Sequence, residues 1–229
     1  MASMCGTNLG DLFPDVFGFN TASSLIALLC FFLAIALTER YSRNGGEPFY
    51  WMLILVVRAA ATNIADFSFN ALHLSFGSVA IAFAGVLALV VGLHTIFGTN
   101  STIGGLPPTN ATYWITMLIA GALGTIIGDG VGHLFSSMQV GVPISAGIST
   151  FAVALILGVR SRMAWTSGAI YWLAIVMVRW WGTSVGDISA FLLSLPVSIG
   201  LTALVLLLTL VLWPEPVATR KDENLSAVA

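Results

Sequence analysis

The chain has 229 residues, of which 58% are hydrophobic and only 8% are charged, and its formal net charge is −2. Soluble globular domains carry about 25% charged residues, so this composition excludes a water-soluble domain, and the small negative net charge argues against a nucleic-acid partner. The two cysteines, Cys5 and Cys30, are too few for a disulfide framework and have no metal-ligand spacing.

Segments of two kinds alternate along the chain. A short polar segment at 6–11 precedes an apolar helix expected at about 21–40, and three longer motif-bearing helices begin at Tyr50, Tyr113 and Tyr171. Each of these is followed by a plain apolar helix, at about 78–97, 143–160 and 196–213. The segments approach or exceed the ~20 residues that cross the ~30 Å hydrocarbon layer. We therefore predict an all-α, polytopic transmembrane bundle with seven full transmembrane helices and a short N-terminal helix.

The three longer helices repeat one motif. In the first, Arg58, Thr62 and Asp66 follow Trp51 by 7, 11 and 15 residues. The same offsets give Trp114, Gly121, Thr125 and Asp129 in the second helix and Trp172, Arg179, Thr183 and Asp187 in the third. A clipped copy, Gly-Thr-x-x-Gly-Asp at 6–11, ends at Asp11. Because a two-helix unit returns the chain to its starting side, we expect four tandem copies in parallel orientation around a pseudo-fourfold axis along the membrane normal.

With these Tyr-Trp…Thr…Asp blocks, the chain resembles a family of bacterial membrane-anchored proteins of unknown function. Its members are built from four tandem repeats, each with two transmembrane helices and a characteristic Trp. The resemblance covers about residues 1–213 and implies a single transmembrane domain with repeats at about 1–43, 44–108, 109–164 and 165–213. It also implies a place in a bacterial inner membrane, but no activity. The first copy departs from the pattern, because it lacks the Tyr-Trp half.

The basic residues predict the orientation. Those outside the motif helices lie on the connections that follow the plain helices, or in the tail: Arg40, Arg43, Arg160, Arg162, Arg220 and Lys221. By the positive-inside rule, these connections and the C-terminus face the cytoplasm, and we expect the polar tail at 214–229 to be disordered. The Tyr-Trp pairs then begin at the cytoplasmic interface, where amphipathic rings anchor well. Trp51, Trp114 and Trp172 are therefore the expected interface anchors.

Steps of four and seven residues place the motif side chains on one stripe of each helix. At 1.5 Å per residue, Thr lies near the midplane of the bilayer, with Arg and Asp about 6 Å to either side. An ionisable group at this depth costs at least ~2.5–3.5 kcal/mol. The stripes must therefore face one another or a water-filled cavity, with the plain helices outside. In this arrangement we expect Arg58 and Arg179 to oppose each other across the centre, with Gly121 leaving room beside them.

The polar stripes predict a functional cluster at the centre of the bundle. It comprises Asp11, Arg58, Thr62, Asp66, Thr125, Asp129, Arg179, Thr183 and Asp187. The leading hypothesis is a transporter or channel for a small inorganic ion, with this cluster as the binding or gating site. Rings of Asp favour cations and rings of Arg favour anions, so the sign of the ion stays open. Oxygen ligands suit Mg²⁺ or Mn²⁺, a desolvated Asp suits a proton, and the Arg pair suits a small anion.

The alternative is a non-transporting scaffold or accessory subunit whose charged core serves fold specificity. Arg on one helix would then bond Asp on the next, although four carboxylates facing two guanidinium groups leave at least one Asp unpaired. We predict no enzyme and no cofactor, because the chain has no HExxH, Gly-x-Ser-x-Gly or phosphate-binding motif. His73 and His133 are either proton relays or polar residues at a water boundary. The lipid bilayer is the expected partner, and a homo-oligomer stays open.

Overall fold

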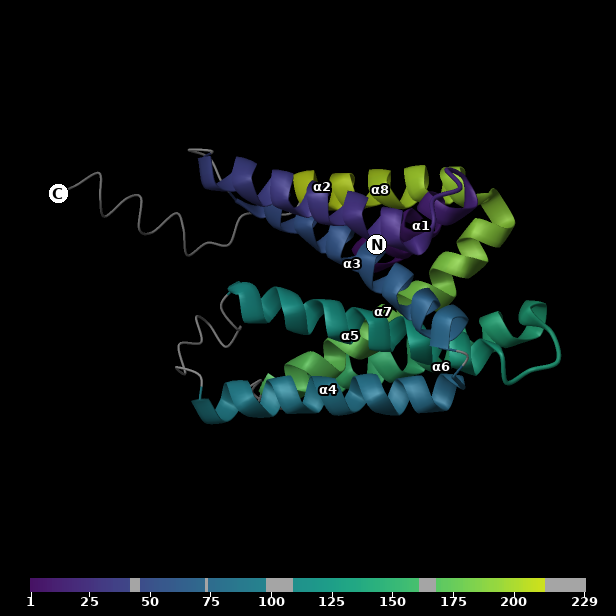
Figure 1. The fold of residues 1–229 in the computed structure, drawn as a ribbon. Coiled ribbons are helices and arrows are strands. Elements are labelled where there is room, and N and C mark those ends of the chain that lie inside the picture. The colour runs from purple at the N-terminus through teal and green to yellow at the C-terminus, as the bar shows by residue number, and fades with distance from the viewer. Residues whose placement is uncertain (42–45, 73, 98–108, 161–167, 213–229) are drawn as a thin grey trace.

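The computed structural model describes residues 1–41, 46–72, 74–97, 109–160 and 168–212, and over these ranges the chain forms helices and no strands (Figure 1). The helices are α1 (Ala2–Asp15), α2 (Thr21–Tyr41), α3 (Glu47–Leu72), α4 (Phe76–Phe97), α5 (Ala111–Gly132), α6 (Met138–Arg160), α7 (Gly168–Leu193) and α8 (Leu195–Leu212). The predicted all-α class is confirmed.

Six of the described helices are long and apolar enough to cross a membrane, as in a multi-pass membrane protein: α2, α3, α4, α5, α6 and α8. With 14 residues, α1 is too short. The 26-residue α7 falls outside this set, because Arg179, Asp187 and three tryptophans interrupt its apolar sequence. The count of seven full spans therefore stays a prediction. Of the basic residues that predict the orientation, four lie outside the described residues: Arg43, Arg162, Arg220 and Lys221.

The helix boundaries differ from the expected ones mainly between α5 and α6. Asn110 caps the start of α5, since its side-chain oxygen accepts a hydrogen bond from the backbone N–H of Tyr113 at 2.9 Å. At the other end, α5 stops at Gly132, with His133 as its C-cap. The next helix begins at Met138, earlier than the apolar pattern indicates. His133 therefore lies at the end of α5.

The four motif-bearing helices enclose the centre of the bundle. Both α1 and α5 pack against α3 and α7, so each of the four contacts two of the others. The plain helices lie outside. Three of them pack mainly on the motif-bearing helix that follows in the chain, α2 on α3, α4 on α5 and α6 on α7, and the last, α8, packs mainly on the first, α1. In Figure 1, α4 runs along one edge of the bundle while α2 and α8 run along the opposite edge.

Burial follows this arrangement. In α3 and α5, 61% of the apolar stretch is buried inside the protein, compared with 11% in α2 and 6% in α4. Large side chains of the plain helices, such as Ile26, Ile81 and Leu207, are exposed, as expected for surfaces that face lipid. The free-energy cost of placing charge in hydrocarbon thus predicts which helices lie inside.

Polar side chains hold the short α1 in the bundle. Asn8 Nδ2 donates to Ser198 Oγ of α8 at 2.7 Å and to the carbonyl oxygen of Gly186 in α7 at 3.4 Å. From α3, Asn63 Nδ2 donates to the carbonyl oxygen of Gly10 at 3.1 Å. Buried amides are stable only with such partners. These bonds therefore fix the depth of α1 and of Asp11, which follows Gly10.

Glycines allow the motif-bearing helices to approach closely. A Cβ atom added at Gly124 of α5 would lie 2.5 Å from Cβ of Arg179 and 2.9 Å from the backbone nitrogen of Trp180 in α7. We expect Gly124→Ala to force α5 and α7 apart and to lower the free energy of unfolding by about 1–3 kcal/mol, as overpacking does. Thermal unfolding of the purified protein measures the effect.

Gly147→Ala is the matched control for this substitution. No atom lies within 4 Å of a Cβ added at Gly147, which is exposed on α6. Equal melting temperatures for the two variants would contradict the close-approach role of Gly124.

Candidate functional site

Four Thr–Asp pairs line one cavity of about 320 Å³. Each pair comes from a different motif-bearing helix, and its spacing of four residues puts both side chains on the same helix face. The pairs are Thr7–Asp11 of α1, Thr62–Asp66 of α3, Thr125–Asp129 of α5 and Thr183–Asp187 of α7. Phe69, Phe76, His133 and Met138 complete the lining. We call this cavity the acidic chamber.

The acidic chamber brings together seven of the nine predicted site residues, all except the two arginines. Thr7 is an additional lining residue that does not belong to the predicted site. The signal was present, because the clipped motif Gly-Thr-x-x-Gly-Asp contains this threonine at the same distance from Asp11 as in the other copies.

The four carboxylates lie at the chamber without close partners. Each aspartate is partly exposed, and within the described ranges none of the four side chains has a hydrogen bond or an ion pair. No three acidic, histidine or cysteine side chains of the described chain are placed to hold one metal ion together. At about 30 Å³ per water molecule, the chamber has room for roughly ten waters. A cation in this chamber would therefore keep water between itself and most of the carboxylates.

The threonine hydroxyls form the inner end of the chamber. Each donates a hydrogen bond to the carbonyl oxygen four residues earlier in its own helix, at 2.9 Å for Thr7, 3.4 Å for Thr62, 3.3 Å for Thr125 and 3.1 Å for Thr183. Because the proton of each hydroxyl is used within its helix, the oxygen lone pairs are left for other groups. This threonine layer is suited to accept hydrogen bonds or to contact a cation.

Arg58 fills the centre of the threonine layer. Its side chain is 0% exposed, and it reaches from α3 to Thr125 Oγ1 of α5 through Nη1 at 2.6 Å and to Thr183 Oγ1 of α7 through Nη2 at 2.5 Å. The carbonyl oxygens of Gly121 and Arg179 each accept a longer bond of 3.4 Å, and Nε has no hydrogen-bond partner. Among the described residues, no carboxylate pairs with Arg58 directly.

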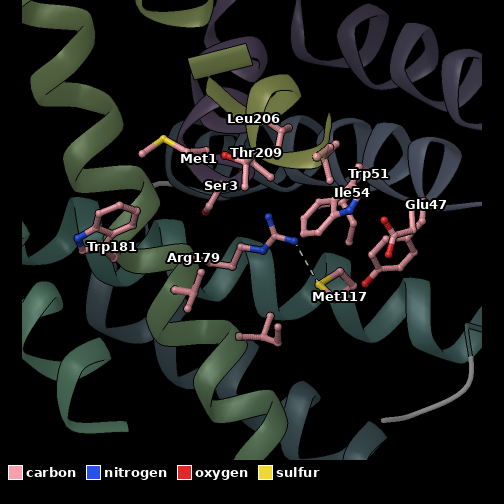
Figure 2. A pocket seen from close by; sticks show the side chains of 15 residues that line it. Met1, Ser3, Glu47, Trp51, Ile54, Met117, Arg179, Trp181, Leu206 and Thr209 are labelled. Carbon is pink, nitrogen blue, oxygen red and sulfur yellow. Dashed lines mark hydrogen bonds between the residues drawn. The ribbon is translucent and has the colours of Figure 1, made fainter. Parts of the chain in front are cut away.

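Arg179 points to a different cavity. Its side chain is 5% exposed, and Nη2 donates to Sδ of Met117 at 3.3 Å. Figure 2 shows this contact within a second cavity of about 460 Å³, which we call the arginine cavity. In α3, α5 and α7 its lining residues precede the threonines, whereas the acidic residues follow them. The threonine layer and Arg58 therefore separate the two cavities.

The two arginines thus do not meet as expected. The guanidinium of Arg58 approaches the backbone of Arg179, while the guanidinium of Arg179 turns away toward Met117. Gly121 does not serve to leave room for two facing arginines. A Cβ atom there would lie 2.8 Å from Cβ of Ala61, so the glycine allows α3 and α5 to approach closely. Its carbonyl oxygen accepts a hydrogen bond from Arg58.

The Tyr-Trp pairs pack against one another between helices. Tyr113 OH lies 2.6 Å from Tyr50 OH and 3.3 Å from Tyr171 OH. The ring of Tyr113 is 5.6 Å from that of Trp172, and the ring of Tyr50 is 5.8 Å from that of Trp114. These contacts tie the corresponding ends of α3, α5 and α7 together. Anchoring at the membrane interface stays a prediction for Trp51, Trp114 and Trp172.

Of the two histidines considered as proton relays, His133 lies in the part of the chain that the structure describes. His133 lines the acidic chamber, stacks on Phe76 with ring centroids 4.7 Å apart, and has Nδ1 2.8 Å from the carbonyl oxygen of Asp129. His73 lies outside the described residues. Of the two, only His133 is known to line the acidic chamber, and its role as a proton relay stays a prediction.

Comparison with known proteins found no match among protein-family models, curated proteins or solved structures. The resemblance to the four-repeat membrane family accordingly rests on the sequence motifs alone.

Proposed function

We propose that this protein is a transporter or channel for a small inorganic cation, with the acidic chamber as the binding site and Arg58 as the barrier at its inner end. One observation carries the proposal. The guanidinium of Arg58 is fully buried and bound to Thr125 and Thr183, both of which line the chamber that holds the four aspartates.

The charge of the lining favours a cation over an anion. All four acidic side chains of the predicted site line the chamber, whereas neither arginine does. Rings of carboxylates favour cations, and hydroxyl and carboxylate oxygens suit hard ions such as Mg²⁺ and Mn²⁺. The carboxylates do not converge on one point, and Mg²⁺ in particular dehydrates reluctantly and keeps several waters when bound. A hydrated divalent cation therefore fits the chamber best.

Arg58 links occupancy of the chamber to passage through it. A buried guanidinium is an electrostatic barrier to cations. Since no carboxylate contacts Arg58 within the described chain, the chamber aspartates stabilise its charge at longer range. A cation bound in the chamber cancels part of this negative charge and repels the guanidinium. Cation binding thus weakens the contacts between Arg58 and the threonine layer. It favours a conformation in which Arg58 no longer blocks the path between the two cavities.

The proposal includes the finer architecture predicted from the sequence. Four two-helix repeats around a pseudo-fourfold axis are supported by the four equivalent Thr–Asp pairs at one cavity and by the closed set of contacts among α1, α3, α5 and α7. With the C-terminus in the cytoplasm of a bacterial cell, as the basic residues indicate, the acidic chamber opens toward the outer face of the inner membrane. The arginine cavity then faces the cytoplasm.

The scaffold alternative requires direct Arg–Asp bonds between motif-bearing helices. In the part of the chain that the structure describes, neither Arg58 nor Arg179 forms such a bond. The contacts of Arg58 with threonine therefore favour the transport proposal.

Flux measurements in proteoliposomes test the proposal. We expect the wild-type protein to carry Mg²⁺ or Mn²⁺, and Asp129→Asn to lower the initial rate at least tenfold, because the isosteric amide replaces one of the four carboxyl groups that line the chamber. Parallel assays with Na⁺, K⁺ and a pH-sensitive dye identify a monovalent cation or a proton as the substrate.

Glu39→Gln is the matched control for this experiment. It makes the same carboxylate-to-amide change on α2, at a residue that lines neither cavity, and we expect flux equal to that of the wild type. If no cation crosses, and Asp129→Asn changes only the melting temperature, the transport proposal is wrong and the scaffold function stands.

A further inference from the structure

The arginine cavity has the size and the lining of a ligand site. Its volume of about 460 Å³ lies within the range of ~300–1,000 Å³ that is usual for such sites. The lining is mainly apolar, with Trp51, Ile54, Met117, Leu206 and Leu210 among the side chains that form it. In Figure 2 the guanidinium of Arg179 points toward the side of the cavity where Trp51, Ile54 and Met117 lie.

Arg179 lacks acceptors that match its guanidinium. This group offers five N–H donors, yet its one hydrogen bond among the described residues goes to the thioether sulfur of Met117, a weak acceptor. Arg58, at the same motif position on α3, has four oxygen acceptors. A guanidinium that is 95% buried without oxygen acceptors is unfavourable, so an anion that entered the cavity would gain strong hydrogen bonds.

The acidic residue of this cavity does not satisfy Arg179. Glu47 lines the cavity from the start of α3 and is exposed, and it forms no ion pair with Arg179 within 4 Å. The unmet donors of Arg179 therefore remain available deep in the cavity, while Glu47 lies at its solvent-exposed end.

We propose that the arginine cavity binds an amphiphilic anion, with a single carboxylate or phosphate group on Arg179 and an apolar body against Ile54, Leu206 and Leu210. The planar fork of a guanidinium matches two oxygens of a carboxylate or phosphate. The apolar lining takes up the rest of the molecule. This site is separate from the cation chamber, because Arg58 and the threonine layer lie between the two cavities. Both a bilayer lipid and a soluble organic acid have the required chemistry.

Energy transfer from tryptophan to cis-parinarate, a fluorescent fatty-acid anion, tests the proposal on the purified full-length protein. We expect saturable binding that decanoate displaces and the uncharged decyl maltoside does not. Arg179→Gln should raise the dissociation constant at least tenfold. Arg40→Gln removes the same charge from an exposed position on α2 and should leave the dissociation constant unchanged.

A second variant keeps the test valid if Arg179→Gln does not fold. Thr209→Phe adds volume at an exposed position that lines the cavity and leaves Arg179 in place, so it should weaken binding several-fold. Displacement by phosphatidylglycerol vesicles assigns the site to a bilayer lipid, and displacement by benzoate assigns it to a soluble carboxylate. Equal competition by charged and uncharged amphiphiles, or equal binding by Arg179→Gln and Arg40→Gln, overturns the proposal.

Discussion

Replacing Arg58 by glutamine is expected to raise the passive leak of a monovalent cation such as K⁺ through the protein by about 30-fold. The guanidinium fills the threonine layer between the two cavities, and its positive charge repels any cation that approaches from the chamber. For two unit charges roughly 8 Å apart at an effective dielectric constant of about 20, this repulsion is ~2 kcal/mol. Removing ~2 kcal/mol from a barrier raises the rate about 30-fold.

The leak is measured as dissipation of a preset cation gradient in proteoliposomes. Arg58→Lys keeps the charge but loses the fork that binds Thr125 and Thr183 together, so its leak should lie between those of the wild type and Arg58→Gln. Arg40→Gln, on the exposed surface of α2, controls for the change in net charge. A leak in Arg58→Gln no greater than in Arg40→Gln would show that Arg58 is not the barrier.

Thr183→Val is expected to lower the free energy of unfolding by about 2 kcal/mol, and to do so only while Arg58 is present. Valine has nearly the shape of threonine but cannot accept the bond from Arg58 Nη2. Hydrogen bonds to charged groups contribute roughly 1.5–3 kcal/mol, and a buried donor left without a partner is penalised further. The variant therefore keeps the packing and leaves a buried guanidinium less well satisfied.

A double-mutant cycle separates this bond from the packing of Thr183. In the Arg58→Met background, Thr183→Val should cost less than about 0.5 kcal/mol, because no donor is left unsatisfied. Thr38→Val serves as the control, since Thr38 is exposed and bonds only the carbonyl oxygen of Ala34 in its own helix. Thermal or denaturant unfolding in detergent gives all the values. The same loss in both backgrounds would mean that Arg58 gains nothing from the threonine layer.

The arrangement of helices was largely predictable from the sequence. Charged groups at regular positions on otherwise apolar helices cannot face lipid, and this alone predicts that α3, α5 and α7 lie inside and that Asp66, Asp129 and Asp187 share a cavity. The short α1 also joins them, because it carries the same Thr-to-Asp spacing in Thr7 and Asp11. Periodicity was sufficient for these features.

The partners of the two arginines were not predictable. An arginine side chain can extend by about one helical turn toward either end of its helix, and the motif spacing does not say which way it extends. Arg58 reaches the threonine layer, whereas Arg179 turns to Met117, although both occupy the same motif position. Close packing of a glycine does not distinguish the two arginines, since Gly6 packs on Arg58 as Gly124 packs on Arg179. The motif also defines where each helix begins and not where it ends, so the end of α5 at Gly132 is known only from the structure.

The packing of the plain helices on the motif-bearing helices has a consequence for biogenesis. When α2 enters the membrane, its main partner α3 has not yet been synthesised, and α4 is in the same position with respect to α5. The outer side of α1 stays uncovered until α8 is made, and Asn8 gains its bond to Ser198 only then. Assembly in the bilayer is therefore completed by the last helix docking on the first, and a nascent chain released before α8 would lack the contacts that cover one side of α1.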